Sequence, residues 1–313
     1  MIRKFLNQST LTFVVFLSLA SASFGQSTNY VEKSSIEEEL GSAASGVNNP
    51  AVNAGSRVVG AAVASLTSGA PKSQGFQFKD PVISPSGTYR YYHDSSTPAG
   101  FGGHDWSAEF SLDADIYDGL ITGVFYQRLT RNGHNSTGTS EDLDSDSVSL
   151  YAAKRFIDLI NAGAAYNLSI ADHDLQGTAI ASLDRTSNGF TAFTGVSDKL
   201  DDWFLSSTLS FTYAHDNYRV QPYLDTGLIT LANEVSYDVV DFFTLGLAFS
   251  YNNFVIQDTF PGVTAVDDDY WMVGPRFRFF PTDELTVSLD LDTEEGFRHY
   301  DAYTVRVGCN YAF

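Results

Sequence analysis

The feature that most constrains the fold is a two-residue alternation of apolar and polar side chains that recurs along the chain. Residues 285–292 read LTVSLDLD, in which leucine and valine alternate with threonine, serine and aspartate. Residues 105–116, DWSAEFSLDADI, follow the same rule. Because successive side chains of a β-strand point to opposite faces, each such segment predicts a strand with one apolar and one polar face.

The connections between these segments indicate which kind of sheet they form. A soluble antiparallel sandwich also alternates, so alternation alone leaves it open. Here tight connections such as YDG, IDL and PTDE alternate with long polar ones at 95–104, 132–145, 171–186 and 257–268, although AHDN is short and TEEGFRH only moderate. Short turns on one side and long loops on the other are typical of an outer-membrane barrel. The chain is therefore predicted to be all-β, a closed antiparallel transmembrane β-barrel of about twelve strands, near 85–94, 105–116, 119–131, 146–157, 159–170, 187–198, 202–214, 218–237, 241–256, 269–280, 283–293 and 300–313.

Some strands are defined less sharply than others. Segment 218–237 is too long and changes phase, which predicts a bulge near Thr226-Gly227 or a missed turn. Strands 119–131 and 187–198 have ambiguous faces. The aromatic residues support the membrane interpretation, because Trp106, Trp203 and Trp271 all fall at proposed strand ends, where membrane barrels carry aromatic girdles.

The N-terminal part of the chain has a different composition. Arg3 and Lys4 precede an apolar run at 11–20 and then small residues, which predicts a cleaved signal peptide over 1–25. Losing these two cations takes the formal charge from −20 to −22. Residues 26–74 are rich in Ser, Gly, Asn and Ala and are expected to form a short arm, helical or disordered. Residues 75–313 would be the barrel, in the outer membrane of a Gram-negative-type bacterium.

The charge and cysteine content narrow the partners. An acidic chain repels nucleic acid, which we exclude as a partner, and its natural counterions are divalent cations. The acid-rich segments SEDLDSD and DDDY lack the ordered spacing and glycine of a calcium loop. They are expected to lie in loops and to meet lipopolysaccharide through bridging cations, with outer-membrane lipid as the other partner. We expect no dedicated metal site and no cofactor, and Cys309 alone excludes an internal disulfide.

The polar face of the predicted strands would line the lumen. Two aspartates face two arginines on the neighbouring strand, which predicts a cross-strand network. This network could simply rigidify the wall, or it could form a pore constriction or contact an inserted helix. The predicted lumen-facing residues are Glu109, Asp113, Asp115, Arg276, Arg278, Asp290, Asp292 and Arg306, together with Arg155, Arg219 and Asp225.

The segments DGLITGVFYQRLTRNG, YRVQPYLDTG and the terminal VRVGCNYAF resemble the β-domain, or translocator, of bacterial autotransporters. The resemblance covers residues 80–313. It implies a barrel of about twelve strands that holds an N-terminal helix, here residues 53–66, in its lumen. It also implies that Phe313 is an assembly signal read by the barrel assembly machinery. Only about fifty residues separate the predicted signal from the barrel, so no sizeable passenger is expected.

The function classes that remain are few. All six histidines map to proposed outer ends or loops, and no strand-borne catalytic pair stands out, so we do not expect an enzyme. One class is an autotransporter-type barrel with a structural, surface or translocation role. The alternative is a passive porin-like channel for small solutes. A soluble periplasmic β protein is a third option.

Overall fold

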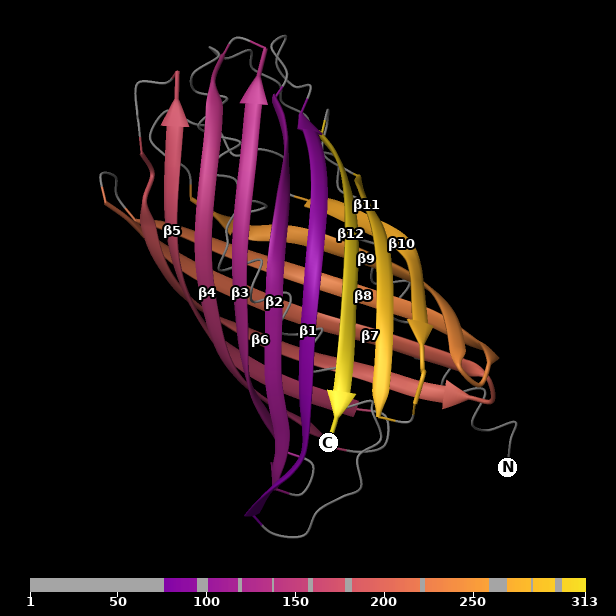
Figure 1. The fold of residues 1–313 in the computed structure, drawn as a ribbon. Helices are drawn as coiled ribbons and strands as arrows, with labels where there is room; N and C mark the ends of the chain where they lie inside the picture. Colours follow the sequence, from indigo (N-terminus) through magenta and orange to yellow (C-terminus); the bar gives the residue numbers. More distant parts are fainter. Residues whose placement is uncertain are drawn as a thin grey trace. The chain divides into compact units, whose positions relative to one another are not determined.

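The computed structural model describes residues 76–94, 101–117, 120–136, 138–156, 160–177, 182–219, 223–258, 269–282, 284–295 and 300–313. The predicted signal peptide, the arm and the segment 53–66 lie outside them. Twelve antiparallel strands pair in sequence order, and the first pairs with the last (Figure 1), so the predicted closed barrel is confirmed. The strands are β1 (Phe76–Asp94), β2 (Phe101–Tyr117), β3 (Leu120–Asn135), β4 (Ser140–Arg155), β5 (Ile160–Gln176), β6 (Arg185–Leu200), β7 (Trp203–Tyr218), β8 (Leu224–Val240), β9 (Phe243–Gln257), β10 (Asp269–Phe279), β11 (Leu285–Glu295) and β12 (Tyr300–Ala312).

The seam of the barrel joins β1 to β12. Tyr91 lies opposite Tyr303 and Gly87 opposite Val307 in this ladder. Beyond the last strand, the backbone N–H of Phe313 donates to the carbonyl oxygen of Pro81 at 3.1 Å. Closure leaves neither terminal strand with an unpaired edge, which a sheet in hydrocarbon cannot tolerate.

The two faces of the sheet follow the two-residue period. On β2, Trp106, Phe110 and Leu112 are exposed, whereas Asp105 and Glu109 are buried. In a closed barrel the buried face is the interior, so polar groups line the lumen and apolar groups face outward. Among the described residues there is no helix long and apolar enough to cross a membrane.

Several strands extend further than the sequence predicted. The expected loop 132–145 is mostly strand, because β3 continues to Asn135 and β4 begins at Ser140. The connection is compact: the backbone N–H of Thr139 donates to the Asn135 side chain at 2.8 Å, and Gly138 adopts a φ of 93° that suits glycine. The segment SEDLDSD is therefore the start of a strand rather than a loop.

The missed turn that the sequence left open lies within segment 218–237, and the bulge lies opposite this segment on β9. Residues 214–217, predicted as a short connection, belong to β7, and β8 begins only at Leu224. A register shift then falls between Gly227 and Leu228, which pair with Ile256 and Phe254. The extra residue lies on β9, so the bulge is on the partner strand.

Candidate functional site: a charged layer at the loop end of the lumen

A cluster of charged and aromatic side chains lines the interior near the strand ends where the long connections were predicted. We call it the loop-end layer. It comes from six different strands, so that no short motif contains it. Its members are Arg90 and Tyr92 on β1, Asp105 on β2, Arg131 on β3, Glu141 on β4, His173 on β5 and Glu294 on β11.

Alternating charges connect the seam of the barrel to the third strand. Arg90 donates from Nε and Nη2 to the two carboxylate oxygens of Glu294 at 2.8 and 2.7 Å, which bridges β1 to β11 across β12. It also donates to Asp105 at 3.1 Å. Arg131 donates from Nε and Nη2 to Asp105 at 2.6 and 2.9 Å. Bidentate arginine–carboxylate pairs are strong and directional. This series of ion pairs therefore fixes the positions of β11, β1, β2 and β3 relative to one another.

Tyr92 crosses two strands to reach the fourth. Tyr92, Gly103, Gly133 and Glu141 are successive register partners across β1 to β4. The Tyr92 hydroxyl donates to Glu141 Oε1 at 2.8 Å, and Glu141 Oε2 lies 3.3 Å from His173 Nε2. A Cβ on Gly103 or Gly133 would lie 2.9 or 2.6 Å from the Tyr92 hydroxyl. The two glycines therefore leave room for the tyrosine to lie across the wall.

Cations flank the aromatic ring that crosses the wall. The guanidinium carbons of Arg90 and Arg131 lie 5.7 and 5.6 Å from the centre of the Tyr92 ring. A similar unit stands beside the layer, where Arg185 on β6 donates to the Tyr218 hydroxyl at 2.6 Å and lies 4.0 Å from Asp216. Contacts of this kind are favourable when desolvated, and the layer is buried throughout.

The structure brings five of the predicted lumen-facing residues together on β10 to β12. Arg276 donates to Asp292 at 2.7 Å and has a second contact to Asp290 at 3.9 Å. Arg278 donates to Asp290, and Arg306 lies 3.9 Å from the same carboxylate. We call this the β10–β12 cluster. Its arginines are partly exposed, unlike those of the loop-end layer.

The three predicted acids on β2 are buried but do not join that cluster. Glu109 accepts hydrogen bonds from Ser86 at 2.8 Å and from Gln127 at 3.2 Å, among others. Asp113 accepts from the Tyr151 hydroxyl at 2.7 Å. Asp115 is buried further along the same face. The predicted lumenal residues are thus distributed over two regions of the wall.

Two residues assigned to the lumen by sequence lie elsewhere. Arg219 follows the end of β7, and its side chain is 81% exposed. Asp225 is on the outer face of β8, where its carboxylate lies 2.6 Å from His215 Nδ1. Both assignments were wrong because the strand boundary and phase of segment 218–237 had been misplaced.

Most of the loop-end layer was missed by the sequence interpretation. Glu141 and His173 fell in segments expected to be loops, and Arg90 and Arg131 were not assigned to the lumen. The available signal was the alternation itself: in residues 140–146, Glu141 and Leu143 alternate with outward aspartates. Extending that pattern would have identified Glu141 as inward-facing.

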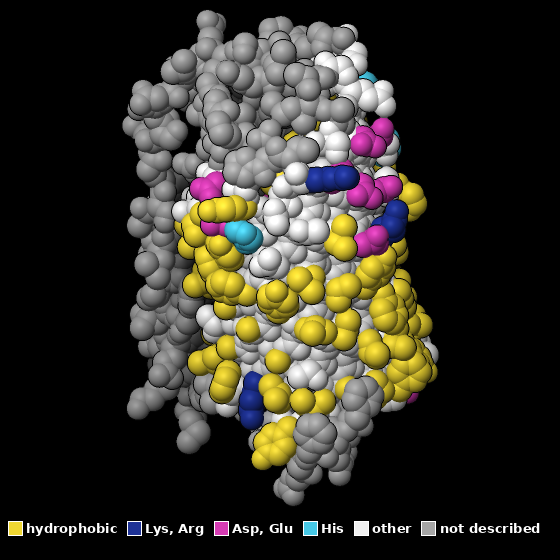
Figure 2. Space-filling view, turned by 90° about the vertical axis from the view of Figure 1, so that its left-hand side faces the viewer, with side chains coloured by type: hydrophobic (Ala, Val, Ile, Leu, Met, Phe, Trp, Pro, Cys, Tyr) yellow, Lys and Arg dark blue, Asp and Glu magenta, His cyan; other side chains and the backbone are white. Residues whose placement is uncertain are grey.

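Exposed apolar side chains gather in a broad band on the side of the barrel that Figure 2 shows, and exposed apolar residues occur on strands all around the barrel. Near the short turns, the rings of Trp203 and Tyr237 lie 4.9 Å apart. Beyond the band on the loop side, Arg128 is 2.9 Å from Asp146 and 3.6 Å from Asp144. Exposed members of the band include Phe110, Leu150, Leu168, Phe190, Leu209, Leu247 and Val305. Within the described part of the chain, no group of three or more His, Cys, Asp or Glu residues is placed to hold a metal ion.

A closed antiparallel barrel of twelve strands with an apolar outer band and a polar interior has the architecture of outer-membrane barrels. Solved structures of similar fold include the translocator domain of autotransporter NalP from Neisseria meningitidis (TM-score 0.63, 11% identity, 82% of this chain and 94% of that chain). Others are the β-domain of the Bordetella autotransporter BrkA (0.59, 10%, 76% and 100%) and the COG4313 outer membrane channel from Pseudomonas putida F1 (0.55, 11%, 78% and 99%). No family model and no curated protein matches the sequence. In fold, the chain is autotransporter β-domain-like.

Proposed function

We propose that the chain is an outer-membrane β-barrel with a structural, surface or translocation role of the autotransporter translocator kind. The observation that carries this proposal is the apolar band on the outer face of a closed sheet. So many exposed apolar side chains, among them Leu150, Leu168 and Leu247, would be unfavourable in water, whereas lipid accommodates them. Export by a cleaved signal peptide over 1–25 belongs to the same proposal.

The location has a direct test. A membrane barrel should fractionate with outer membranes and should migrate differently on a gel before and after heating. Recovery of the protein in the soluble periplasmic fraction, with no heat-dependent shift, would refute the membrane proposal.

A second candidate function is a passive channel for small solutes. It is favoured by the polar interior and by the fold shared with an outer membrane channel. The two functions differ in whether residues 26–74 occupy the lumen. Single-channel recording on the protein with and without these residues separates them: a silent full-length protein that conducts after truncation supports the plugged barrel. Equal open conductance from both would favour the pore.

The partners of such a barrel are also proposals. We infer that Phe313, which is exposed at the end of β12, is read by the barrel assembly machinery, and that lipopolysaccharide meets the polar rim above the apolar band. Deleting Phe313 should reduce the amount of heat-modifiable barrel in the outer membrane. Phe313→Trp, which keeps an aromatic terminus, is the matched control. Normal assembly of the deletion variant would contradict this role.

A further inference from the structure

The inner face of β3 to β6 differs in chemistry from the rest of the lumen. Toward the short-turn side of the loop-end layer, every inward-facing described side chain at 121–127, 147–153, 161–169 and 187–195 is uncharged. We call this surface the neutral track. The residues that define it are Phe125, Gln127, Tyr151, Asn161, Asn167 and Phe193.

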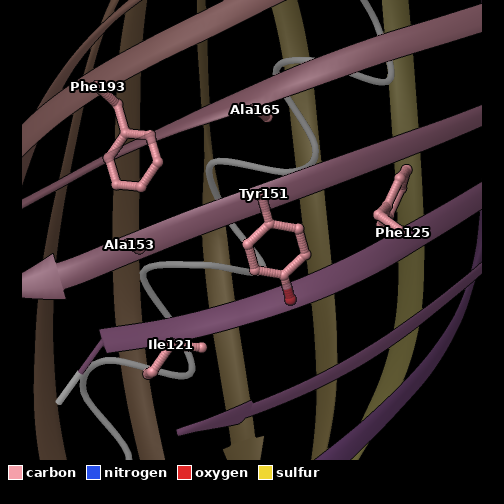
Figure 3. Close-up of a cluster of buried hydrophobic side chains, with 6 residues drawn as sticks. All are labelled: Ile121, Phe125, Tyr151, Ala153, Ala165 and Phe193. Carbon is pink, nitrogen blue, oxygen red and sulfur yellow. The ribbon is translucent and has the colours of Figure 1, made fainter. Parts of the chain in front are cut away.

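The neutral track presents aromatic faces that lie along the wall (Figure 3). A Cβ on Gly123 would lie 2.4 Å from Cζ of Tyr151, and a Cβ on Gly163 would lie 2.4 Å from Cζ of Phe193. Each ring therefore covers a glycine of the neighbouring strand. One face of each ring therefore lies against the sheet, and both rings are buried.

Hydrogen-bond acceptors without partners lie beside these rings. Gln127 uses its amide nitrogen on Glu109 at 3.2 Å, and Asn167 uses its own on Thr191 at 3.1 Å. The side-chain oxygens of Gln127, Asn161 and Asn167 have no hydrogen-bond partner, although all three residues are at least 98% buried. A buried acceptor that stays unsatisfied is costly, so the three oxygens favour a ligand that donates hydrogen bonds.

Residues that pair with one another across successive strands form a row of the barrel wall. The acceptors and the rings are in adjacent rows. Asn167 pairs with Ser149, which is two residues from Tyr151 on the same strand. Residues two apart on a strand are separated by about 6.7 Å. Phe193 is in the row of Gly163, two residues from Asn161. A ligand of a few ångströms could therefore contact a ring and an acceptor together.

We propose that the neutral track binds an uncharged carbohydrate. A sugar ring has a flat C–H face that suits an aromatic surface, and its hydroxyl groups donate to acceptors such as Asn167 Oδ1. Ligand sites of this composition combine apolar and aromatic walls with a few placed polar groups. No track residue is charged, and the carboxylates that bond to the track, Glu109 on Gln127 and Asp113 on Tyr151, favour a neutral sugar over an acidic one. This inference goes beyond the proposed function, and it requires a lumen that the sugar can enter in the full mature chain.

The test is a calorimetric titration of the full mature chain with maltohexaose, in a zwitterionic detergent that carries no sugar. Saturable binding is expected. Phe193→Leu, which removes the flat face, and Asn167→Leu, which removes the acceptor, should each weaken binding about fivefold or more. Phe193→Tyr keeps the ring and should bind as the parent does. Thr304→Val, an isosteric change of a buried residue on β12, is the matched control and should leave affinity unchanged.

Three results would overturn the proposal. The first is the lack of saturable heat from a full chain that shows the heat-dependent gel shift of a folded barrel. The second is unchanged affinity in both Phe193→Leu and Asn167→Leu. The third is equal binding of an acidic uronic acid oligomer, since the neutrality of the track would then have no part in recognition.

Discussion

The loop-end layer and the β10–β12 cluster use the same ion-pair chemistry but differ in burial. In the first, the side chains of Arg131, Asp105 and Arg90 are 1%, 4% and 9% exposed. In the second, Arg276, Arg278 and Arg306 are 14%, 24% and 25% exposed. Removing one partner of a buried pair leaves an uncompensated charge, whereas water can solvate the survivor of an exposed pair. The loop-end layer should therefore be a rigid part of the fold, and the β10–β12 cluster should tolerate change.

The largest effect is expected at the centre of the loop-end layer. Asp105→Asn removes the carboxylate shared by Arg90 and Arg131, and so leaves two buried guanidinium groups with less compensation. We expect the free energy of unfolding to fall by about 3 to 5 kcal/mol, measured by urea unfolding in detergent micelles. A loss no larger than that of Asp292→Asn would remove the proposed contrast between the two regions.

The second-largest loss of stability is expected at Gly133, which lies against Tyr92 of the loop-end layer. Gly133→Ala places a methyl group 2.6 Å from the Tyr92 hydroxyl and 2.7 Å from Cε1 of Phe101, so both rings must shift and the contact of Tyr92 with Glu141 is disturbed. Overpacking of this kind costs about 1 to 3 kcal/mol, which the same unfolding measurement would detect. Gly87→Ala on β1 is the matched control, because its Cβ would have no neighbour closer than 3.7 Å. Equal stability of the two variants would show that Tyr92 does not need the glycine.

The β10–β12 cluster should respond more weakly. Asp292→Asn breaks the 2.7 Å contact with Arg276, but Arg276 keeps Asp290 at 3.9 Å and the carbonyl oxygen of Pro275 at 3.2 Å. We expect a loss of about 1 kcal/mol in urea unfolding. A loss of the size expected for Asp105→Asn would show that this cluster is as rigid as the loop-end layer.

The smallest change in stability is expected for an exposed ion pair on the outer face. This change is the reference against which the losses in the loop-end layer and the β10–β12 cluster are compared. Arg128 and its partner Asp146 are 50% and 47% exposed. Arg128→Ala should change the free energy of unfolding by less than about 0.5 kcal/mol, since exposed pairs contribute little. Increasing the salt concentration should reduce even this difference. A salt-independent loss above about 1 kcal/mol would contradict the assignment of Arg128 to a solvated surface.

The fold was predictable because its governing signal is local. A period of two, such as that of residues 285–292, assigns each side chain to a face without knowledge of its neighbours. Polar strand ends were harder: Asp142 and Asp144 face outward beyond the apolar band and resemble a loop in sequence. Trp106 was expected at a strand end for the same reason, but it is the sixth residue of β2.

The candidate site was only partly predictable. The β10–β12 cluster involves neighbouring strands, so its contacts follow from the order of the chain and the face of each residue. Tyr92 and Glu141 are 49 residues apart and on strands that are not neighbours. Their contact requires Gly103 and Gly133 in the same row, and rows are set by strand register, which the alternation leaves undetermined.

The sequence by itself determined the strand content, the two faces of the sheet and the need for closure, because these depend on side-chain chemistry with a fixed period. Only the tertiary structure decided which inward residues meet. Register and closure place Arg90 beside Glu294, 204 residues away, and place aromatic rings over glycines of adjacent strands. The physical reason is that side chains in a barrel meet when they are paired across strands, whereas the two-residue alternation describes only the order of residues along one strand.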